Sequence, residues 1–266
     1  MSESVVLSEV DGRGIATVAI NRPAVNNAYN AAVIEGLAQA FGALARNPAV
    51  RVAILRGNGR HFQAGADLAF LKELSKQSLE EGLAFSRLTV ATVDALRRFL
   101  RPTIALVQGG CFGGGVGLVS ACDIAIATSD AIFSLTEVRW GITPAPIMGL
   151  ITRRLGPRAL GRWALSGERF GAAQAHRMGL IHEVCAPGML DEAAAPIIEA
   201  LLTNAPEATA RTKELIEESL LHDGNLGFGE AMAREGAARR QLPEAHEGLA
   251  SFAEKRLPSW YPAKQK

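Results

Sequence analysis

The sequence has few cysteines and no long apolar run, and each absence excludes a class of protein. Only three cysteines occur among 266 residues, Cys111, Cys122 and Cys185, and their spacing fits neither a metal site nor a disulfide framework. We therefore expect reduced, buried thiols in a cytoplasmic protein. No apolar run approaches roughly 20 residues, the length of a membrane span, and the acidic N-terminus lacks a targeting pattern.

The sequence also lacks an excess of charge of either sign. Its 28 Lys+Arg residues nearly balance 27 Asp+Glu residues, for a net charge of +1. A nucleic-acid-binding protein is expected to carry a strongly basic face, so the charge balance argues against that class. With 48% hydrophobic and 21% charged residues, the composition is typical of a globular protein with one sizeable core.

Short apolar runs rich in Val and Ile alternate with helical stretches in the first half of the chain. Strands are predicted over Val5–Val10, Ile15–Asn21, Val52–Arg56, Thr103–Gln108 and Asp123–Ala127. Apolar residues at helical spacing predict helices over Asn30–Arg46 and Glu80–Leu100. Strands that alternate with helices in this way indicate an α/β core.

Beyond about residue 145 the strand signals nearly vanish, and helical stretches predominate. One short strand is predicted over Glu183–Cys185. Helices are predicted over Pro157–Leu165, Ala172–Met178, Leu190–Leu202, Pro206–His222, Leu226–Arg240 and Glu244–Lys255. No low-complexity linker separates the two halves, so we expect one continuous unit with a helical appendage.

The first segment with chemical interest is His61-Phe-Gln-Ala-Gly-Ala-Asp-Leu68, which follows the strand at Val52–Arg56. Its small residues let the backbone approach a ligand closely. Asp67 is a candidate cap for a helix that starts just beyond it. A tight turn that leads into a helix would have the same composition, so this segment alone leaves both interpretations open.

The second segment is a glycine cluster, Gly109–Gly117, between a strand and an apolar helix that is predicted to run to Cys122. Free N–H groups at a helix start suit an anion or a developing oxyanion. The glycine spacing does not match a dinucleotide fingerprint, and no Gly-Lys-Ser/Thr follows for a P-loop. Close helix packing is an alternative reason for the glycines.

The third segment places Glu137 among apolar residues. A buried carboxylate is costly unless it is paired or functional. Burial would raise its pKa into the range that is useful for proton transfer. The alternative is a surface Glu137 paired with Arg139.

In their order and separation, the three segments resemble the enoyl-CoA hydratase/isomerase (crotonase) family. The resemblance covers nearly the whole chain. It rests on Ile20–Pro23, Asn27-Ala28, Phe62–Leu68, Gly109–Gly117, Cys122–Ala125, Glu137, Gly141, Leu165–Gly167, Gly179–Ile181 and Phe252–Arg256.

The resemblance implies an α/β crotonase (ClpP-like) fold, a superhelix of repeated ββα turns over residues 1–200. A C-terminal helical trimerisation region over residues 201–266 would build a homotrimer or a hexamer, the latter a dimer of trimers. The substrate would be an acyl-CoA thioester. Coenzyme A is then part of the substrate, and neither a permanently bound cofactor nor a metal is expected.

Roles for individual residues follow from the same resemblance. The backbone N–H groups of Ala66 and Gly114 would hold the thioester oxygen as it becomes enolate-like. Glu137 would be the acid/base. Contacts with coenzyme A are implied for Val25, Ala64 and Asp67, and for Phe252 and Lys255, which would reach the coenzyme A of a neighbouring subunit.

The sequence departs from typical hydratases of this family at Gly117, where they carry a second glutamate. One carboxylate is what the Δ3,Δ2-enoyl-CoA isomerase branch uses. However, Phe112–Asp123 and Leu135–Ile147 resemble bacterial hydratases of 3-methylglutaconyl-CoA and isohexenylglutaconyl-CoA, several of which also lack that glutamate. We therefore expect hydration of a branched glutaconyl-CoA. Arg139 is the candidate cation for the second carboxylate of such a substrate, with a surface contact as the alternative.

Two further interpretations stay open. The single glutamate fits an isomerase, and a non-catalytic crotonase-fold protein that binds acyl-CoA or RNA is the third hypothesis. The set of Ala66, Gly114 and Glu137, together with the near-zero net charge, argues against the third. The stretch Leu71–Leu83 is expected to be a flexible wall of the acyl pocket, with Leu71 and Gly117 among the residues around the substrate.

Overall fold

The strands of the computed structural model form two sheets, and the structure describes residues 4–222 and 226–262. The larger sheet has six strands in the order β1-β2-β3-β5-β7-β10. These are β1 (Val6–Val10), β2 (Ile15–Ile20), β3 (Val52–Gly57), β5 (Thr103–Val107), β7 (Ile124–Thr128) and β10 (Glu183–Cys185). Only the β1–β2 pair is antiparallel. All six strands predicted from the apolar runs are confirmed, with ends shifted by one residue at most.

The smaller sheet was not predicted, because its strands are only two or three residues long. It consists of β4 (Gln63–Ala64), β6 (Gly110–Phe112), β8 (Ile132–Ser134) and β9 (Phe170–Gly171). β4, β6 and β8 run parallel, and each follows a strand of the larger sheet within a few residues. The chain therefore repeats a strand-strand-helix turn, which confirms the expected ββα superhelix.

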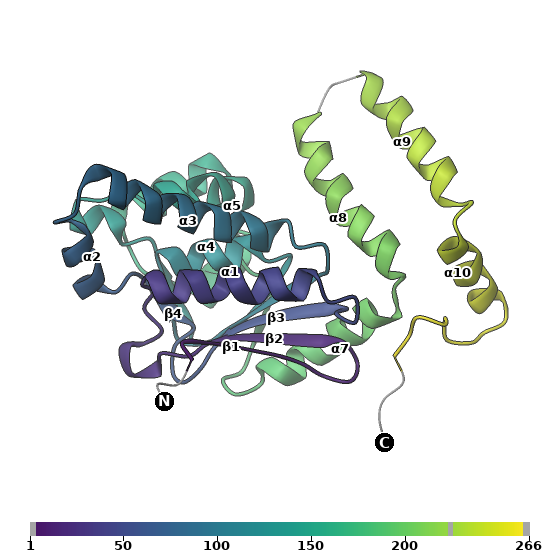
Figure 1. Cartoon of the computed structure of the whole chain (residues 1–266), viewed down its shortest axis with the longest axis horizontal. Coiled ribbons are helices and arrows are strands. Elements are labelled where there is room, and N and C mark those ends of the chain that lie inside the picture. Colours follow the sequence, from purple (N-terminus) through teal and green to yellow (C-terminus); the bar gives the residue numbers. More distant parts are fainter. Residues whose placement is uncertain (1–3, 223–225, 263–266) are drawn as a thin grey trace.

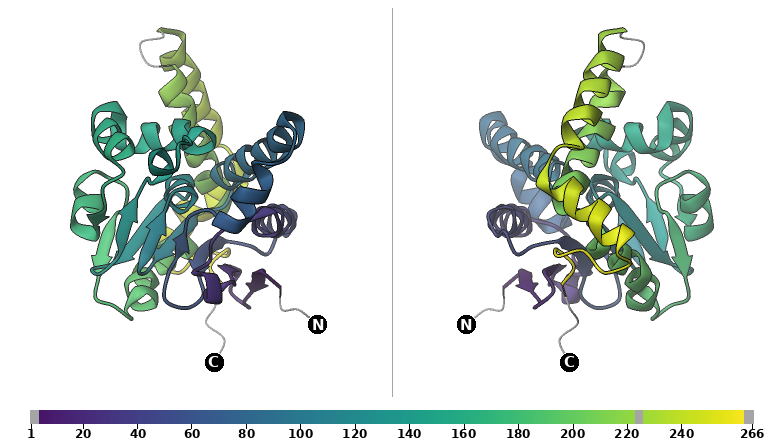
Figure 2. Two further views of the ribbon diagram at one scale, coloured as in Figure 1. Left: turned by 90° about the vertical axis from the view of Figure 1, so that its left-hand side faces the viewer. Right: turned by 90° about the vertical axis from the view of Figure 1, so that its right-hand side faces the viewer.

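Helices cover both faces of the larger sheet (Figures 1 and 2). The main core lies under α1 (Ala31–Ala45), α3 (Leu79–Arg97), α4 (Gly114–Ala121) and α5 (Ala145–Ser166). A smaller apolar cluster packs α7 (Leu190–Thr203) against the opposite face, around Ile104, Leu106 and Ile126. Alternate residues of the strands thus enter two separate cores, which explains the continuous apolar runs in β5 and β7.

Two helical regions add to the predicted pattern. The stretch Leu71–Leu83 contains the end of α2 (Leu68–Leu74), which Asp67 caps, a non-helical link over residues 75–78, and the start of α3, where Ser78 with Glu81 forms a capping box. The helix expected from Pro157 is the second part of α5, which already begins at Ala145. The two parts join at Gly156, whose φ of 72° is non-helical.

The C-terminal helices extend away from the core (Figure 1). After α6 (Ala172–Arg177) and α7 come α8 (Pro206–Leu221), α9 (Leu226–Arg239) and α10 (Pro243–Ala253). The predicted division after residue 200 lies in the last turn of α7, which packs with the core.

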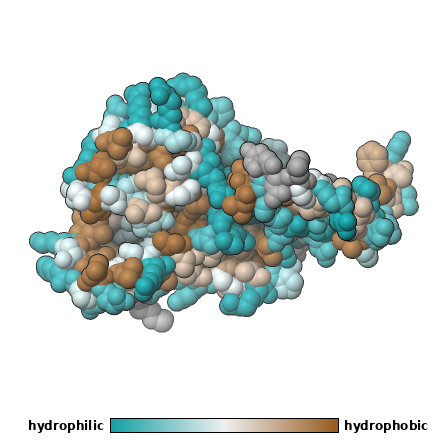
Figure 3. Space-filling model, turned by 90° about the horizontal axis from the view of Figure 1, so that it is seen from above, coloured by the Kyte–Doolittle hydropathy of each residue, from teal (hydrophilic) through white to brown (hydrophobic). Residues whose placement is uncertain are grey.

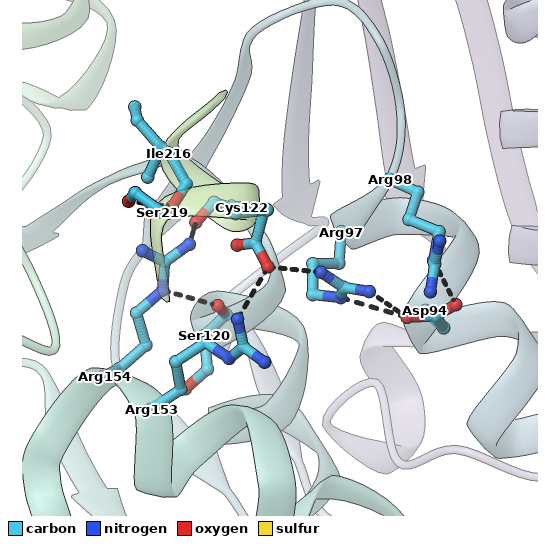
Figure 4. Close-up of polar contacts among 10 residues, drawn as sticks. Asp94, Arg97, Arg98, Ser120, Cys122, Arg153, Arg154, Ile216 and Ser219 are labelled. Carbon is cyan, nitrogen blue, oxygen red and sulfur yellow. Dashed lines mark hydrogen bonds and ion pairs between the residues drawn. The ribbon is translucent and has the colours of Figure 1, made fainter. Parts of the chain in front are cut away.

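Ion pairs hold α8 against the core. The Lys213 ammonium lies 2.7 Å from the Asp123 carboxylate. Glu217 accepts hydrogen bonds from Arg97 of α3 and Arg153 of α5, and these two arginines are labelled in Figure 4. Within the two described stretches, no helix combines the length and apolarity that a bilayer crossing requires.

Phe62 is predicted to be a key core side chain, because it is fully buried immediately before β4. Phe62→Ala should lower the free energy of unfolding by about 3–5 kcal/mol, since the lost burial is compounded by a cavity. Urea denaturation followed by circular dichroism would measure the change. A loss below about 1 kcal/mol, as for a surface substitution, would contradict this assignment.

Candidate active site

Two glycine-containing turns meet at one edge of the smaller sheet. β4 and β6 are parallel neighbours, with Ala64 opposite Phe112. The residues that follow each strand therefore lie side by side, and these include Ala66 and Gly114. Among the described residues, neither the Ala66 N–H nor the Gly114 N–H donates a hydrogen bond to a protein acceptor. Two free backbone donors at one place suit an oxyanion.

The turn at Ala66 is held from both sides. The Tyr29 N–H donates to the Gly65 carbonyl at 2.9 Å, and the Asp67 N–H donates to the Tyr29 carbonyl at 2.9 Å. The buried Gln63 amide both accepts from the Gly65 N–H (3.0 Å) and donates to the Gly65 carbonyl (3.1 Å). These bonds use the neighbouring groups and leave the Ala66 N–H unpaired.

The turn at Gly114 requires glycine for two reasons. Gly113, the N-cap of α4, has a φ of 51°, and its N–H donates to the Ser134 carbonyl of β8. A Cβ on Gly113 would lie 2.8 Å from Glu137 Oε1, and one on Gly114 would lie 2.6 Å from Tyr29 Cε1. The glycines thus let a carboxylate and an aromatic ring approach the start of α4.

Glu137 begins a short 3-10 helix, η2 (Glu137–Trp140), just after β8. Burial raises the pKa of its carboxyl above the ordinary value of 4.5. Its Oε2 atom is buried and has no hydrogen-bond partner in the described structure. No ion pair with Arg139, the expected alternative, is found among the described residues, and the Arg139 side chain lies near Gly167.

A cavity of about 640 Å³ opens beside these groups. Apolar residues surround a hollow in the lobe that carries the core (Figure 3). The apolar lining of the cavity includes Val33, Ile34, Leu37, Leu71, Leu74, Phe85, Val90, Val93, Leu118, Ile142 and Ile147. Glu137 is the one charged residue among the described residues of this lining. The cavity suits an uncharged aliphatic group.

Gly117 lies against Ile147 rather than against open space. A Cβ at Gly117 would collide with Ile147 Cγ2 and lie 2.9 Å from Ile147 Cβ. Ile147 in turn lines the cavity. An apolar side chain from α5 therefore occupies the neighbourhood of the missing second glutamate.

The candidate cation Arg139 does not line the cavity. Its side chain is exposed and packs near Gly167, where a Cβ would lie 2.9 Å from Arg139 Nε. Residue 139 is two positions after Glu137 in a 3-10 helix, and the helical turn directs it away from the side that Glu137 occupies. The expectation that Arg139 faces the acyl pocket is corrected.

The residues expected to contact coenzyme A fall into two groups. Val25 is exposed. The Ala64 N–H donates a hydrogen bond to the carbonyl of Asn26, the residue that follows Val25. Asp67 caps α2 and accepts a hydrogen bond from Arg22 at 3.1 Å, so these three lie near Ala66. Phe252, which is 85% exposed, and Lys255 lie at the end of α10, outside the cavity lining (Figure 1).

Three residues of the site were not singled out from the sequence. Gln63 clamps Gly65, Tyr29 contacts Gly114, and Ile147 fills the space at Gly117. Gln63 and Ile147 lie in segments that carried the family resemblance, yet their roles depend on contacts with residues far away in the chain. Tyr29 directly follows the Asn27-Ala28 pair, and the chain has only two tyrosines. The position of this rare residue next to a segment of the family resemblance was the available signal.

Comparison with known proteins agrees with this geometry. The model of the "Enoyl-CoA hydratase/isomerase" family matches residues 11–263. The chain belongs to the enoyl-CoA hydratase/isomerase family. It is similar to a putative enoyl-CoA hydratase of Thermus thermophilus, with 31% identity over 94% of this chain and 98% of the relative. It is also similar to the mevalonyl-coenzyme A hydratase sidH of Aspergillus fumigatus, with 32% identity over 94% and 92% of the two chains.

A solved structure supports the same membership. The crystal structure of an enoyl-CoA hydratase from Shewanella pealeana superposes with a TM-score of 0.93 at 36% identity, covering 96% of each chain. The fold is therefore the crotonase fold, and the protein is an enoyl-CoA hydratase or isomerase. The groups suited to acyl-CoA chemistry lie at the ends of β4, β6 and β8.

The close contact of Gly117 with Ile147 predicts strong coupling between the two positions. Gly117→Ala should destabilise the protein by about 1–3 kcal/mol through overpacking. The cost should be smaller in an Ile147→Ala background, which vacates the space. Urea denaturation of the wild type, both single variants and the double variant gives the coupling energy. Additive effects within error would contradict the contact.

Burial of Glu137 predicts a pH-dependent effect on stability. Since the folded-state pKa is raised, the carboxyl's contribution to stability is fully present below its ordinary value of 4.5 and is lost as pH rises through the folded-state value. Glu137→Gln lacks this loss. The variant should unfold at higher urea than the wild type at neutral pH, and the difference should vanish in acid. A difference that does not change with pH would contradict an uncompensated buried carboxylate.

Proposed function

We propose that this protein hydrates a 2-enoyl-CoA, with Glu137 as the single acid/base. The observation that carries the proposal is the half-buried Glu137 carboxylate beside Gly113 at the start of α4, on the wall of an apolar cavity, with its Oε2 buried and without a hydrogen-bond partner in the described structure. Relatives named as hydratases of different acyl-CoA thioesters support hydration as the reaction type.

The proposed oxyanion donors are the N–H groups of Ala66 and Gly114. During hydration, negative charge develops on the thioester oxygen. Backbone donors aimed at such charge typically contribute about 3–4 kcal/mol each to transition-state stabilisation. Their freedom from other hydrogen bonds in the described structure supports this role.

The proposed reaction needs only one carboxyl group to move protons. The water oxygen bonds to the β-carbon while the Glu137 carboxylate takes a proton from that water. The electron pair of the double bond moves to the thioester, which becomes an enolate held at Ala66 and Gly114. The neutral Glu137 then returns the proton to the α-carbon, and the product is the 3-hydroxyacyl-CoA.

The size and apolar lining of the cavity support a proposal for the acyl group of the substrate. A large apolar space supports the isohexenyl branch of isohexenylglutaconyl-CoA better than the small branch of 3-methylglutaconyl-CoA. The described lining holds no Lys, Arg or His, so the second carboxylate of either substrate would have to face the open side of the cavity. An uncharged branched 2-enoyl-CoA is the simplest fit.

Coenzyme A is proposed to lie near Val25, Ala64 and Asp67, close to the Ala66 donor. Phe252 and Lys255 are proposed to contact the coenzyme A of a neighbouring subunit in a trimer or a dimer of trimers. The exposure of Phe252 at the end of α10, away from the cavity of its own chain, supports this arrangement.

The second candidate function is Δ3,Δ2-enoyl-CoA isomerisation. Ile147 at the place of a second glutamate favours it, because proton removal and return need one carboxylate and no water. Glu137 would take the α-proton of a 3-enoyl-CoA and return it to the γ-carbon. A panel of 2-enoyl-CoA and 3-enoyl-CoA substrates followed by mass spectrometry separates the two, since only hydration adds the mass of one water.

Glu137→Gln is predicted to lower kcat/KM by about 10²–10⁴-fold, because the amide cannot move the proton. Binding of the acyl-CoA should be retained, which calorimetry would show. Glu230→Gln makes the same change on the exposed face of α9 and is the matched control. Full activity of Glu137→Gln would reject Glu137 as the acid/base. A wild type that converts no substrate of the panel would instead favour a non-catalytic binding protein.

A further inference from the structure

Tyr29 bridges both halves of the oxyanion site. Its backbone pairs with the turn at Ala66, through the Gly65 carbonyl and the Asp67 N–H. Its ring lies against Gly114, so closely that only glycine leaves room there. The residue that contacts both donor-bearing turns also lines the cavity, together with Glu137.

The Tyr29 hydroxyl has no hydrogen-bond partner among the described residues. Burial, and next the negative charge of Glu137, raise the pKa of this phenol to about 12. At neutral pH it therefore keeps its proton, and it presents one O–H donor and an acceptor oxygen.

The other polar side chains of the cavity wall are already engaged or exposed. Gln63 bonds twice to Gly65. The hydroxyls of Ser86 and Thr89 donate to carbonyls within α3. Thr143 lies exposed in the loop before α5. Within this described lining, the half-buried Tyr29 is thus the polar side chain besides Glu137 that is sheltered from solvent and has a free hydrogen-bonding atom.

Hydration with one carboxylate leaves the attacking water with one protein partner. Glu137 takes one hydrogen of the water, and nothing at Gly117 can hold the other, because Ile147 fills that space. A water held at one point has no fixed direction of attack, and such misorientation lowers the rate.

We propose that the Tyr29 phenol is the second group that holds the attacking water. This role rests on the proposed hydration. The phenol oxygen accepts a hydrogen bond from the second water hydrogen and keeps its own proton throughout, while Glu137 alone carries the transferred proton. In the reverse reaction the phenol holds the departing hydroxyl group.

Tyr29→Phe tests the role, since it keeps the ring against Gly114 and removes only the hydroxyl. The expected result is a fall in the kcat of hydration of roughly 10–100-fold, as for a hydrogen bond in a buried site, with little change in KM. Exchange of α-protons for deuterium on a saturated acyl-CoA should persist, because it needs Glu137 and the oxyanion donors but no water attack. Tyr261→Phe removes the only other phenol, whose hydroxyl bonds to Glu199 outside the cavity, and is the matched control.

The outcomes separate the two proposals. Slower hydration with retained exchange supports the role of Tyr29. If Tyr29→Phe hydrates the substrate at the wild-type rate, the role of Tyr29 is overturned and the proposed function is unaffected. Loss of exchange together with hydration also overturns it, because the ring would then serve the oxyanion turn alone. A wild type that hydrates no substrate of the panel overturns the proposed function and the Tyr29 role with it.

Discussion

The parallel pairing of three very short strands is the interaction on which the site depends. β4, β6 and β8 each have only two or three residues, yet Ala66 follows the first, Gly114 the second and Glu137 the third. The carboxyl ends of parallel strands meet at one edge of a sheet. The three segments therefore reach one cavity, although more than 70 positions separate Ala66 from Glu137 in the sequence. The six-stranded sheet and the buried Phe62 beneath them keep this edge in register.

The same arrangement explains why the carboxylate stays reactive. Glu137 is half-buried, and within the described chain its buried Oε2 has neither a cation nor a hydrogen-bond donor beside it, so the protein bears a desolvation cost that a surface ion pair would avoid. Gly113 and Gly114 remove the side chains that would separate this carboxylate and Tyr29 from the start of α4. Ile147 keeps the wall apolar opposite Gly117. Desolvation of the Glu137 carboxylate is therefore the origin of both the cost in stability and the proton-transfer chemistry.

Much of this could be predicted from the sequence, and the rest depended on distant contacts. The strands of the larger sheet were predictable because Val and Ile recur in them, and the cap at Asp67 because its signal is local. β4 and β8 are too short to leave a periodic pattern. The capping box at Ser78 does have a local signal in the sequence, because Glu81 follows three residues later. Arg139 was misplaced because proximity in sequence says little about direction in a 3-10 helix. Gly117 was recognised as unusual, but only the packing of Ile147 explains what replaces a side chain there.

The central claim is that Glu137, acting beside the oxyanion donors Ala66 and Gly114, moves a proton at the α-carbon of an acyl-CoA thioester. The most direct measurement is α-proton exchange on a saturated acyl-CoA in deuterium oxide, followed by mass spectrometry, since it involves neither water addition nor double-bond migration. The account predicts that the wild type incorporates deuterium and that Glu137→Gln, folded and able to bind the thioester, does not. Exchange by Glu137→Gln at the wild-type rate would contradict it.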